Sequence, residues 1–347
     1  MSAKKILVFF VALAVVVFGG CTGPRIKVNV LVEPSLDFDR VERFYDGLAI
    51  IRKDDKYGCV DKTGEIIIPL EYDYIWGFSD GLAVVKINEK YGFVDKNNNI
   101  AVPFEYDDTW GFSEDLAAVE KDGKWGYIDK NNNIILPFVY DWAISFSEGL
   151  SSVMKDEKFG FVDKTGEIVI PCIYDLAGGF TEGLAQVKKD DNWGVIDKAG
   201  NIIVPLEYDY VWSFSEGWAR VGVGPSRMHY EYGFIDKTGE IVVPIGEYRF
   251  PGQLSENLLR VLKDDKRGFI NKSRKVVIPF EYNNAWDFSE GLAAVKKEVN
   301  GKWGFIDKNN NIIVPFEYRD VDSFNEGLAW VKKDGKWGIL EIEQTEK

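Results

Sequence analysis

One short pattern, repeated along nearly the whole chain, limits the folds that this sequence can adopt. Residues 124–130 read Lys-Trp-Gly-Tyr-Ile-Asp-Lys, and the glycine of this pattern occurs nine times at intervals of 34 to 39 residues. A fixed period of this length is typical of repeat proteins, in which each unit buries its apolar faces against its neighbours. The glycines, to which we assign a structural role in every repeat, are Gly58, Gly92, Gly126, Gly160, Gly194, Gly233, Gly268, Gly304 and Gly338.

Each unit contains three runs that are typical of β-strands, at residues 116–120, 124–129 and 133–136 in the unit used as reference. Asp122-Gly123 separates the first two runs and is typical of a two-residue hairpin turn with positive φ. A glycine inside the second run lowers strand stability, so we expect a β-bulge or a backbone approach too close for a Cβ atom. The unit is therefore predicted to be a three-stranded antiparallel meander.

The segments between the predicted strands also follow a pattern. The run from Asp129 to Asn132 predicts a type I turn that continues into a left-handed residue, which makes a second hairpin. Pro137 lacks an N–H group, so we expect it to mark the end of the third strand. The connector at 104–115 carries Trp110 and other aromatic residues. We expect a compact loop with one helical turn, whose aromatic rings seal the joint between neighbouring units.

Apolar side chains fall on both faces of the predicted strands, so both faces need to be covered. We therefore predict an all-β tandem repeat of about nine three-stranded antiparallel units, each of about 34 residues, in an open β-solenoid-like stack. The alternative is a closed propeller-like ring. In that ring, a degenerate first copy that begins near residue 26 supplies a strand to the last unit, at 337–342, which lacks its own.

The repeat resembles that of a known family. Residues 302–308 read Lys-Trp-Gly-Phe-Ile-Asp-Lys, and residues 312–318 read Ile-Ile-Val-Pro-Phe-Glu-Tyr. With these motifs the chain resembles the bacterial WG-repeat (KWG-repeat) proteins over residues 44–341. The resemblance implies an all-β repeat protein of bacterial origin, often exported and associated with binding or scaffolding. It implies no catalytic residues.

The N-terminus is typical of an exported lipoprotein. Lys4 and Lys5 precede the apolar run 6–18, and Val-Phe-Gly-Gly-Cys follows at 17–21, which resembles a lipobox with Cys21 as the lipid attachment site. We therefore predict a lipoprotein signal peptide at 1–20, a lipidated tether at 21–25 and a single WG-repeat β domain at 26–347. The lipid bilayer is then a partner through acylated Cys21, and the protein faces outside the cytoplasm in the bacterial cell envelope. A plain signal peptide is the alternative.

The charge balance argues against some partners. The chain has 42 Lys and Arg residues against 56 Asp and Glu residues, a net charge of -14, and no basic block offsets this field. Nucleic acid is therefore not an expected partner.

The sequence offers little that predicts catalysis. Acids such as Glu105 and Asp107 resemble the carboxylate pair of a glycosidase, but equivalent acids recur in most units, whereas a catalytic pair is needed once. The run from Asp95 to Asn99 resembles a calcium loop but lacks the Gly and Glu that an EF-hand requires. There is one histidine, and no nucleophile elbow, P-loop or His-Glu-x-x-His motif. We expect no catalytic residue, metal or cofactor.

The repeat is least regular at the insertion 222–231 and in the unit 245–275. A special site would be expected there, and drift in a tolerant loop explains the same departures. The candidate ligand-binding residues are Arg227, His229, Tyr230, Arg249 and Arg267.

The function predicted from these observations is that of a non-catalytic cell-envelope lipoprotein. It would bind or scaffold a protein or a cell-wall glycan through the repeat surface, because many near-identical units favour avidity. Two alternatives stay open, a glycan-acting hydrolase with its site at 222–275 and a structural envelope spacer.

Overall fold

The computed structural model describes residues 26–225 and 230–343, and this part of the chain consists of strands and turns without a helix. The first half of the strands are β1 (Lys27–Leu36), β2 (Arg40–Tyr45), β3 (Leu48–Lys53), β4 (Lys56–Asp61), β5 (Ile66–Tyr72), β6 (Tyr74–Ser79), β7 (Leu82–Ile87), β8 (Lys90–Asp95), β9 (Ile100–Tyr106), β10 (Asp108–Thr109), β11 (Ala117–Lys121), β12 (Lys124–Ile128), β13 (Ile134–Tyr140), β14 (Trp142–Ala143), β15 (Leu150–Lys155), β16 (Lys158–Asp163), β17 (Ile168–Tyr174) and β18 (Leu176–Ala177). The second half are β19 (Leu184–Lys189), β20 (Asn192–Asp197), β21 (Ile202–Tyr208), β22 (Tyr210–Val211), β23 (Trp218–Val223), β24 (Glu231–Asp236), β25 (Ile241–Tyr248), β26 (Leu254–Ser255), β27 (Leu258–Lys263), β28 (Lys266–Asn271), β29 (Val276–Tyr282), β30 (Asn284–Ala285), β31 (Leu292–Lys296), β32 (Trp303–Asp307), β33 (Ile312–Tyr318), β34 (Asp320–Val321), β35 (Leu328–Lys333) and β36 (Lys336–Glu343).

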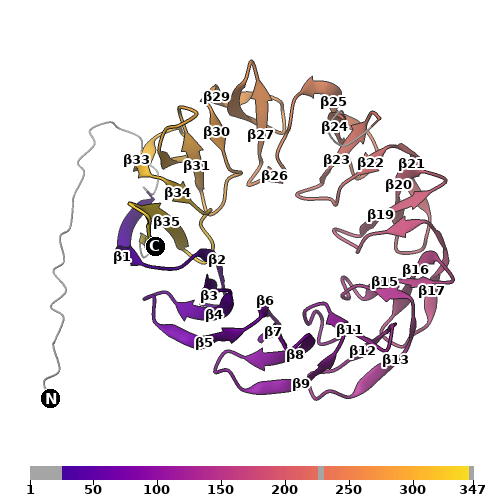
Figure 1. Cartoon of the computed structure of the whole chain (residues 1–347). Coiled ribbons are helices and arrows are strands. Elements are labelled where there is room, and N and C mark those ends of the chain that lie inside the picture. The colour runs from indigo at the N-terminus through magenta and orange to yellow at the C-terminus, as the bar shows by residue number, and fades with distance from the viewer. Residues whose placement is uncertain (1–25, 226–229, 344–347) are drawn as a thin grey trace, which may run out of the picture.

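These strands form nine antiparallel sheets of four strands each. In eight sheets the strands are consecutive in the chain, from β2–β5 (blade 1) to β30–β33 (blade 8), and the ninth has the order β1-β36-β35-β34 (blade 9). The sheets follow one another around a ring with a central opening (Figure 1). This arrangement is a nine-bladed β-propeller.

The prediction of an open stack of three-stranded units is therefore wrong, and the ring that was kept as the alternative is the observed arrangement. The fourth strand of each blade comes from the connector, where β6, β10 and their equivalents pair with the next strand. The ring closes because β1 pairs with β36, from Lys27 opposite Glu343 to Leu36 opposite Trp337. Closure gives the last blade its outer strand, which an open array would leave unpaired.

Pro137 does not end the third predicted strand, contrary to expectation. Strand β13 runs through it from Ile134 to Tyr140, and the prolines at the same place in other blades also lie inside strands. The reason is the position of these strands at the outer edge of each blade, where one side of the ladder faces solvent. A proline there removes no hydrogen bond, and it also blocks pairing with another chain.

The turn predictions are confirmed. Asp122 and Gly123 have φ values of 53° and 75°, and Asn132 has a φ of 64°. Asp129 fixes the second turn, because its Oδ1 accepts hydrogen bonds from the backbone N–H groups two and four residues later. The helical turn expected in the connector is absent from the described residues, which instead form a short bridge and a turn.

The glycine of the repeat lies where the second and third predicted strands come closest. A Cβ atom on Gly126 would lie 2.8 Å from the backbone oxygen of Leu136. The pairing of β12 with β13 also shifts register between Trp125 and Tyr127, on either side of this glycine. In blade 9 the neighbour is Val32 of β1, whose oxygen would lie 2.6 Å from a Cβ on Gly338. The N-terminal strand thus reproduces the contact that the third predicted strand makes elsewhere.

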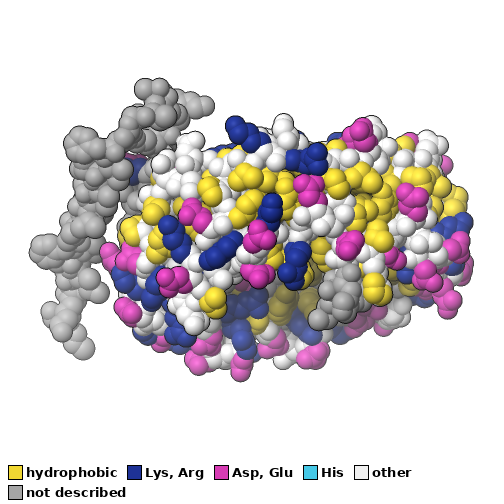
Figure 2. All heavy atoms as spheres, turned by 90° about the horizontal axis from the view of Figure 1, so that it is seen from above, with side chains coloured by type: hydrophobic (Ala, Val, Ile, Leu, Met, Phe, Trp, Pro, Cys, Tyr) yellow, Lys and Arg dark blue, Asp and Glu magenta, His cyan; other side chains and the backbone are white. Residues whose placement is uncertain are grey.

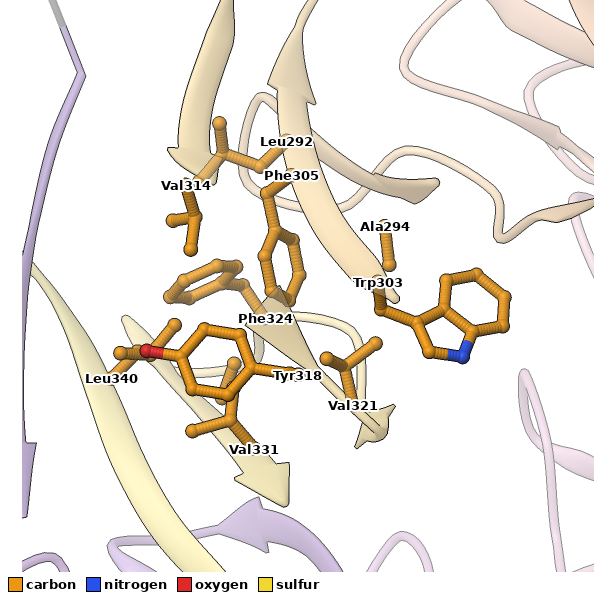
Figure 3. Packing of buried hydrophobic residues seen from close by; sticks show 11 residues of the cluster. Leu292, Ala294, Trp303, Phe305, Val314, Tyr318, Val321, Phe324, Val331 and Leu340 are labelled. Atoms are coloured by element: carbon orange, nitrogen blue, oxygen red, sulfur yellow. The ribbon is translucent and has the colours of Figure 1, made fainter. Parts of the chain in front are cut away.

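The core is divided into nine clusters, each shared by two neighbouring blades. Figure 3 shows the cluster between blades 8 and 9, in which Phe305 of one blade packs against Phe324 of the next at 5.0 Å between ring centroids. The cluster between blades 9 and 1 contains Trp330 and Phe44, so it spans the closure. Each unit therefore buries its apolar faces only through its neighbours.

Hydrogen bonds join the connector turns of successive blades. The carboxylate of Glu148 accepts a bond of 3.0 Å from the backbone N–H of Gly183 in the next blade, and Lys198 lies 3.1 Å from the same carboxylate. The recurring Ser, Glu, Gly sequence of the connector is explained by this clamp. Equivalent bonds join Asp80 to Asp115, Glu114 to Gly149, Glu182 to Gly217, Glu216 to Asn257, Glu256 to Gly291, Glu290 to Gly327 and Glu326 to Gly47.

Candidate functional site

The innermost strand of each blade, which is β34 in blade 9, and the connector after it form the wall of the central opening, as β2, β6 and β26 show in Figure 1. The strand is short because the connector turns away after two residues in most blades. The residues that follow this strand in the connector differ in size from one copy of the repeat to the next. The surface of the wall therefore differs from blade to blade around the ring.

A pocket of about 400 Å³ lies on this wall across blades 1 to 4. Trp76 is 48% exposed, which is unusual for a tryptophan, and it lines the pocket together with the half-buried Trp110. The aromatic and polar residues of its lining include Glu42, Tyr45, Trp76, Ser79, Trp110 and Ser145.

The tryptophans of this wall contact one another from blade to blade. The ring centroids of Trp76 and Trp110 are 5.4 Å apart with an interplanar angle of 56°, and those of Trp110 and Trp142 are 6.2 Å apart at 79°. We call Trp76, Trp110 and Trp142 the tryptophan shelf. Trp142 in turn packs on Trp125, the aromatic residue of the repeat motif in blade 3. These contacts hold the shelf in place without any ligand.

Polar groups border the shelf. Glu42 lies in β2 with its side chain 35% exposed, and its carboxylate is 3.2 Å from the guanidinium of Arg40. The hydroxyl of Ser145 donates a hydrogen bond of 3.0 Å to the backbone oxygen of Gly111. A hydroxyl that already donates can still accept a bond. The pocket therefore combines flat apolar rings with an acid and hydroxyl acceptors.

The acids that recur in the repeat form hydrogen bonds and ion pairs within the fold. Asp107 accepts hydrogen bonds from Lys90 Nζ at 2.5 Å and from the backbone N–H of Asp122 at 2.9 Å. Glu105 accepts bonds from Lys121 and from the side-chain amide of Asn132. The hydrogen bond from Lys90 is the main cause that lowers the pKa of Asp107, and that from Lys121 lowers the pKa of Glu105. Neither carboxyl group is kept protonated, as a general acid of a glycosidase must be.

A second hollow, of about 530 Å³, lies near Arg319 and Asp320 in blade 9. Its lining also includes Lys332 and Gly335 but no aromatic ring. It offers a ligand no flat apolar surface on which to pack. The pocket lined by Trp76 and Trp110 is therefore the better candidate for a ligand-binding site.

The outer wall exposes apolar residues on the outer strands of several blades. Ile134 is 60% exposed and Ile202 is 56% exposed, and both begin the outer strand of their blade. Figure 2 shows hydrophobic side chains on this wall among side chains of both charges. Apolar atoms make up about half or more of a typical protein surface, so these residues do not by themselves define a site.

The residues predicted from the sequence do not meet in one place. Tyr230 packs on Tyr232 of β24 at 6.2 Å between centroids. Arg249 is largely exposed and lies 3.7 Å from Asp265, whereas Arg267 is half-buried in β28. Cys21, Arg227 and His229 lie outside the described residues. Their roles stay predictions.

Sequence reasoning missed Trp76 and Glu42 and treated Trp110 as part of a seal between units. A signal was present, because the position of Trp76 is occupied by Ile144 in blade 4 and Gly178 in blade 5. A residue that seals a joint is needed in every unit. A large residue that is present in some units and absent from others is better explained by a local role.

Within residues 26–225 and 230–343, no group of three or more His, Cys, Asp or Glu side chains is arranged to hold a metal ion. The same part of the chain contains no helix long and apolar enough to cross a membrane.

A closed ring of nine blades with a pocket on its inner wall defines the class of this protein, a nine-bladed β-propeller. The chain belongs to the WG-repeat family: it matches the family described as WG containing repeat in nine successive segments, at residues 29–57, 57–91, 91–125, 125–159, 159–193, 193–224, 232–266, 268–303 and 303–337. No curated protein matches its sequence.

Solved structures of other proteins are similar in shape and not in sequence. A structure titled as that of the eukaryotic initiation factor is 12% identical, with a TM-score of 0.57 over 81% of this chain and 88% of that one. BamB from Moraxella catarrhalis is 11% identical, with a TM-score of 0.47 over 90% of this chain and 100% of that one. Streptogramin B lyase is 15% identical, with a TM-score of 0.36 over 92% and 98%. The last two scores are too low to support an inference, and the first supports the fold alone.

Proposed function

We propose that this protein is a non-catalytic binding protein of the bacterial cell envelope, anchored to a membrane through acylated Cys21, and that its inner-wall pocket binds a saccharide unit of a cell-wall glycan. The observation that carries the proposal is Trp76, a tryptophan that is 48% exposed beside a second tryptophan in a pocket. Exposing such a ring to water is unfavourable, so a partner that covers it would be stabilising.

The chemistry of the pocket fits a sugar. The C–H groups on one face of a pyranose ring pack well on a flat indole, and its hydroxyl groups need hydrogen-bond partners at the edge. Trp76 and Trp110 offer the rings, while Glu42 and the serine hydroxyls offer the partners. The tilt of 56° between the two indoles presents a curved surface to the ligand.

The same residues favour binding over hydrolysis. A glycosidase uses two carboxyl groups on either side of the bond that breaks. Among the described residues that line the pocket, Glu42 is the one that carries a carboxyl group. The recurring acids are bound by lysines and by N–H groups, as Asp107 is by Lys90 and Asp122 and Glu105 is by Lys121 and Asn132. We therefore keep the hydrolase with a site at 222–275 only as an outcome of the test.

The test is the affinity of the purified protein for peptidoglycan fragments and neutral oligosaccharides, measured by isothermal titration calorimetry. Trp76→Ala is expected to weaken binding about tenfold or more, because it removes the exposed aromatic surface. The matched control is Trp286→Ala. Trp286 occupies the same position in blade 8 and is 44% exposed, but it does not line the pocket. This variant should bind as the wild type does.

Other results would favour the alternatives. Equal loss in both variants, or no loss in either, contradicts a site at the tryptophan shelf. Release of sugar fragments from a polysaccharide panel, abolished by alanine at acids in 222–275, would show the hydrolase. No saccharide binding and no captured envelope protein would leave the structural spacer.

A further inference from the structure

Guanidinium groups replace apolar side chains at the joints between blades 6, 7 and 8. In each blade one residue pairs with the residue that follows the repeat glycine, as Ile50 pairs with Cys59, and its side chain faces the next blade. In most blades this residue is small or apolar, but it is Arg220 in β23 and Arg260 in β27. Blades 6 and 7 thus carry a positively charged side chain at a position where most blades carry a small or apolar one. The small or apolar residues at this position are Ile50, Val84, Ala118, Ser152, Ala294 and Trp330, and blade 5 has the uncharged polar residue Gln186.

Arg260 is held by a carboxylate from the next blade. Its Nε donates a hydrogen bond of 2.8 Å to Asp287, and the side chains are only 18% and 30% exposed. Asp287 also accepts from the backbone N–H of Gln253. Gly252 makes room for it, because a Cβ atom there would collide with the Asp287 carboxylate. Arg260 and Asp287 are therefore held in place at this joint by their contact with each other and by the surrounding backbone.

Arg267 lies beside this pair without a carboxylate of its own. It occupies the position of the repeat aromatic, and β28 pairs with β27 so that both arginines project toward blade 8. Its Nε is buried and makes no hydrogen bond with the described residues. Burial, and then the positive charge of Arg260, lower the pKa of Arg267, while Asp287 acts in the opposite direction.

Arg220, in blade 6, adds a third positive charge near Arg260 and Arg267. Its guanidinium stacks on Trp212 with the central carbon 4.0 Å from the ring centroid, and one Nη donates to the backbone oxygen of Pro251 at 2.7 Å. Its Nε, too, is buried without a partner among the described residues. The negative charge of Asp287 acts on all three guanidinium groups, but among them only Arg260 is shown hydrogen-bonded to it.

An excess of half-buried positive charge is costly unless an anion compensates it. It is also unexpected by chance in a chain with a net charge of -14. We propose that the joint between blades 7 and 8 binds an oxyanion, the carboxylate or phosphate group of a ligand, with Arg267 as its direct partner. The planar guanidinium fork matches both groups, and Arg260, oriented by Asp287, and Arg220 supply the surrounding field.

This site is independent of the proposed saccharide pocket. The tryptophan shelf belongs to blades 2 to 4, and the arginines belong to blades 6 and 7, across the central opening in Figure 1. The failure of one proposal would leave the other intact, because Trp76→Ala should not change anion binding.

The experiment measures anion binding by the purified protein in three titrations at constant ionic strength, with inorganic phosphate, glucuronate and neutral glucose. At least one anion is expected to bind, and glucose should not bind at this site. Arg267→Trp should weaken anion binding about tenfold or more, because a charge-assisted contact is lost. Tryptophan is the residue at this position in blades 3, 5, 8 and 9, so the variant is compatible with the fold. Arg267→Gln is the second variant and should give the same loss.

The matched control is Arg274→Asn, which removes an exposed arginine from the same irregular unit and should leave the affinity unchanged. Preference for phosphate or for glucuronate tells which group the ligand carries, and either result supports the site. No anion binding by the wild type, or equal affinity in the wild type and both Arg267 variants, would overturn the proposal.

Discussion

Replacing Gly126 by alanine tests how tightly the repeat glycine is held. The new Cβ atom would lie 2.8 Å from the backbone oxygen of Leu136 and 3.1 Å from the backbone nitrogen of Phe138. The first contact is about 0.6 Å closer than ordinary van der Waals contact, and backbone atoms on both strands would have to move. Overpacking of this kind costs about 1–3 kcal/mol, so we expect Gly126→Ala to lose about that much stability.

The matched control is Gly77→Ala. A Cβ atom at this position would lie 3.7 Å from the Tyr45 ring, which is ordinary contact, and the residue does not have positive φ. The control should change stability by less than about 0.5 kcal/mol. Urea unfolding followed by tryptophan fluorescence measures both variants. If Gly126→Ala is as stable as Gly77→Ala, the close approach is not what maintains glycine in the repeat.

Two further predictions concern ionisable groups. The lysine partners lower the pKa values of Asp73, Asp107, Asp141 and Asp175, so their contribution to stability is present above the ordinary carboxyl pKa and is lost as pH falls through the lowered values. The urea midpoint should therefore fall between pH 5 and about pH 3, and a midpoint that rises over this range would contradict the assignment. Burial raises the pKa of the Cys59 thiol to about 12, whereas Cys172 is only half-buried. A thiol reagent should label Cys172 much faster than Cys59 in the native protein, and equal rates would show that the joint between blades 1 and 2 opens readily.

Much of the fold could be predicted because the same turn and strand patterns recur in every copy of the repeat. Asp129 and Gly123 show the turn chemistry, and the period shows units that depend on their neighbours. The structure agrees on these points because turn geometry is set by a few adjacent residues. The all-β class and the number of units follow from the same observations.

Closure could not be deduced from local patterns. The order of strands depends on where β1 pairs, and β1 lies about 300 residues from β36 in the sequence. The prolines were also ambiguous. Pro137 fits the end of a strand or the solvent side of an edge strand, and only the position of β13 in its blade distinguishes the two. The connectors hid the fourth strand because β10 and its equivalents have only two residues.

The candidate sites were harder to predict than the fold. Trp76 and Trp110 come together because the connectors of consecutive blades lie side by side on the inner wall, which requires the ring. Arg267 was singled out because it breaks the repeat, but the carboxylate nearest to it, that of Asp287, comes from the next blade, where it is bound to Arg260. Residues that depart from the repeat indicate candidate sites in the sequence. The packing of neighbouring blades shows which of these residues lie close together.

The most direct test of the closed ring is a cross-link between β1 and β36. Asn29 and Glu341 are paired in the register of these strands. A protein with both residues replaced by cysteine, and with Cys21→Ser and Cys172→Ser, should form an intramolecular disulfide under mild oxidation. We expect a monomer that migrates faster on a non-reducing gel and returns to the normal position after reduction. Free thiols, or disulfides only between chains, would contradict closure by the first strand.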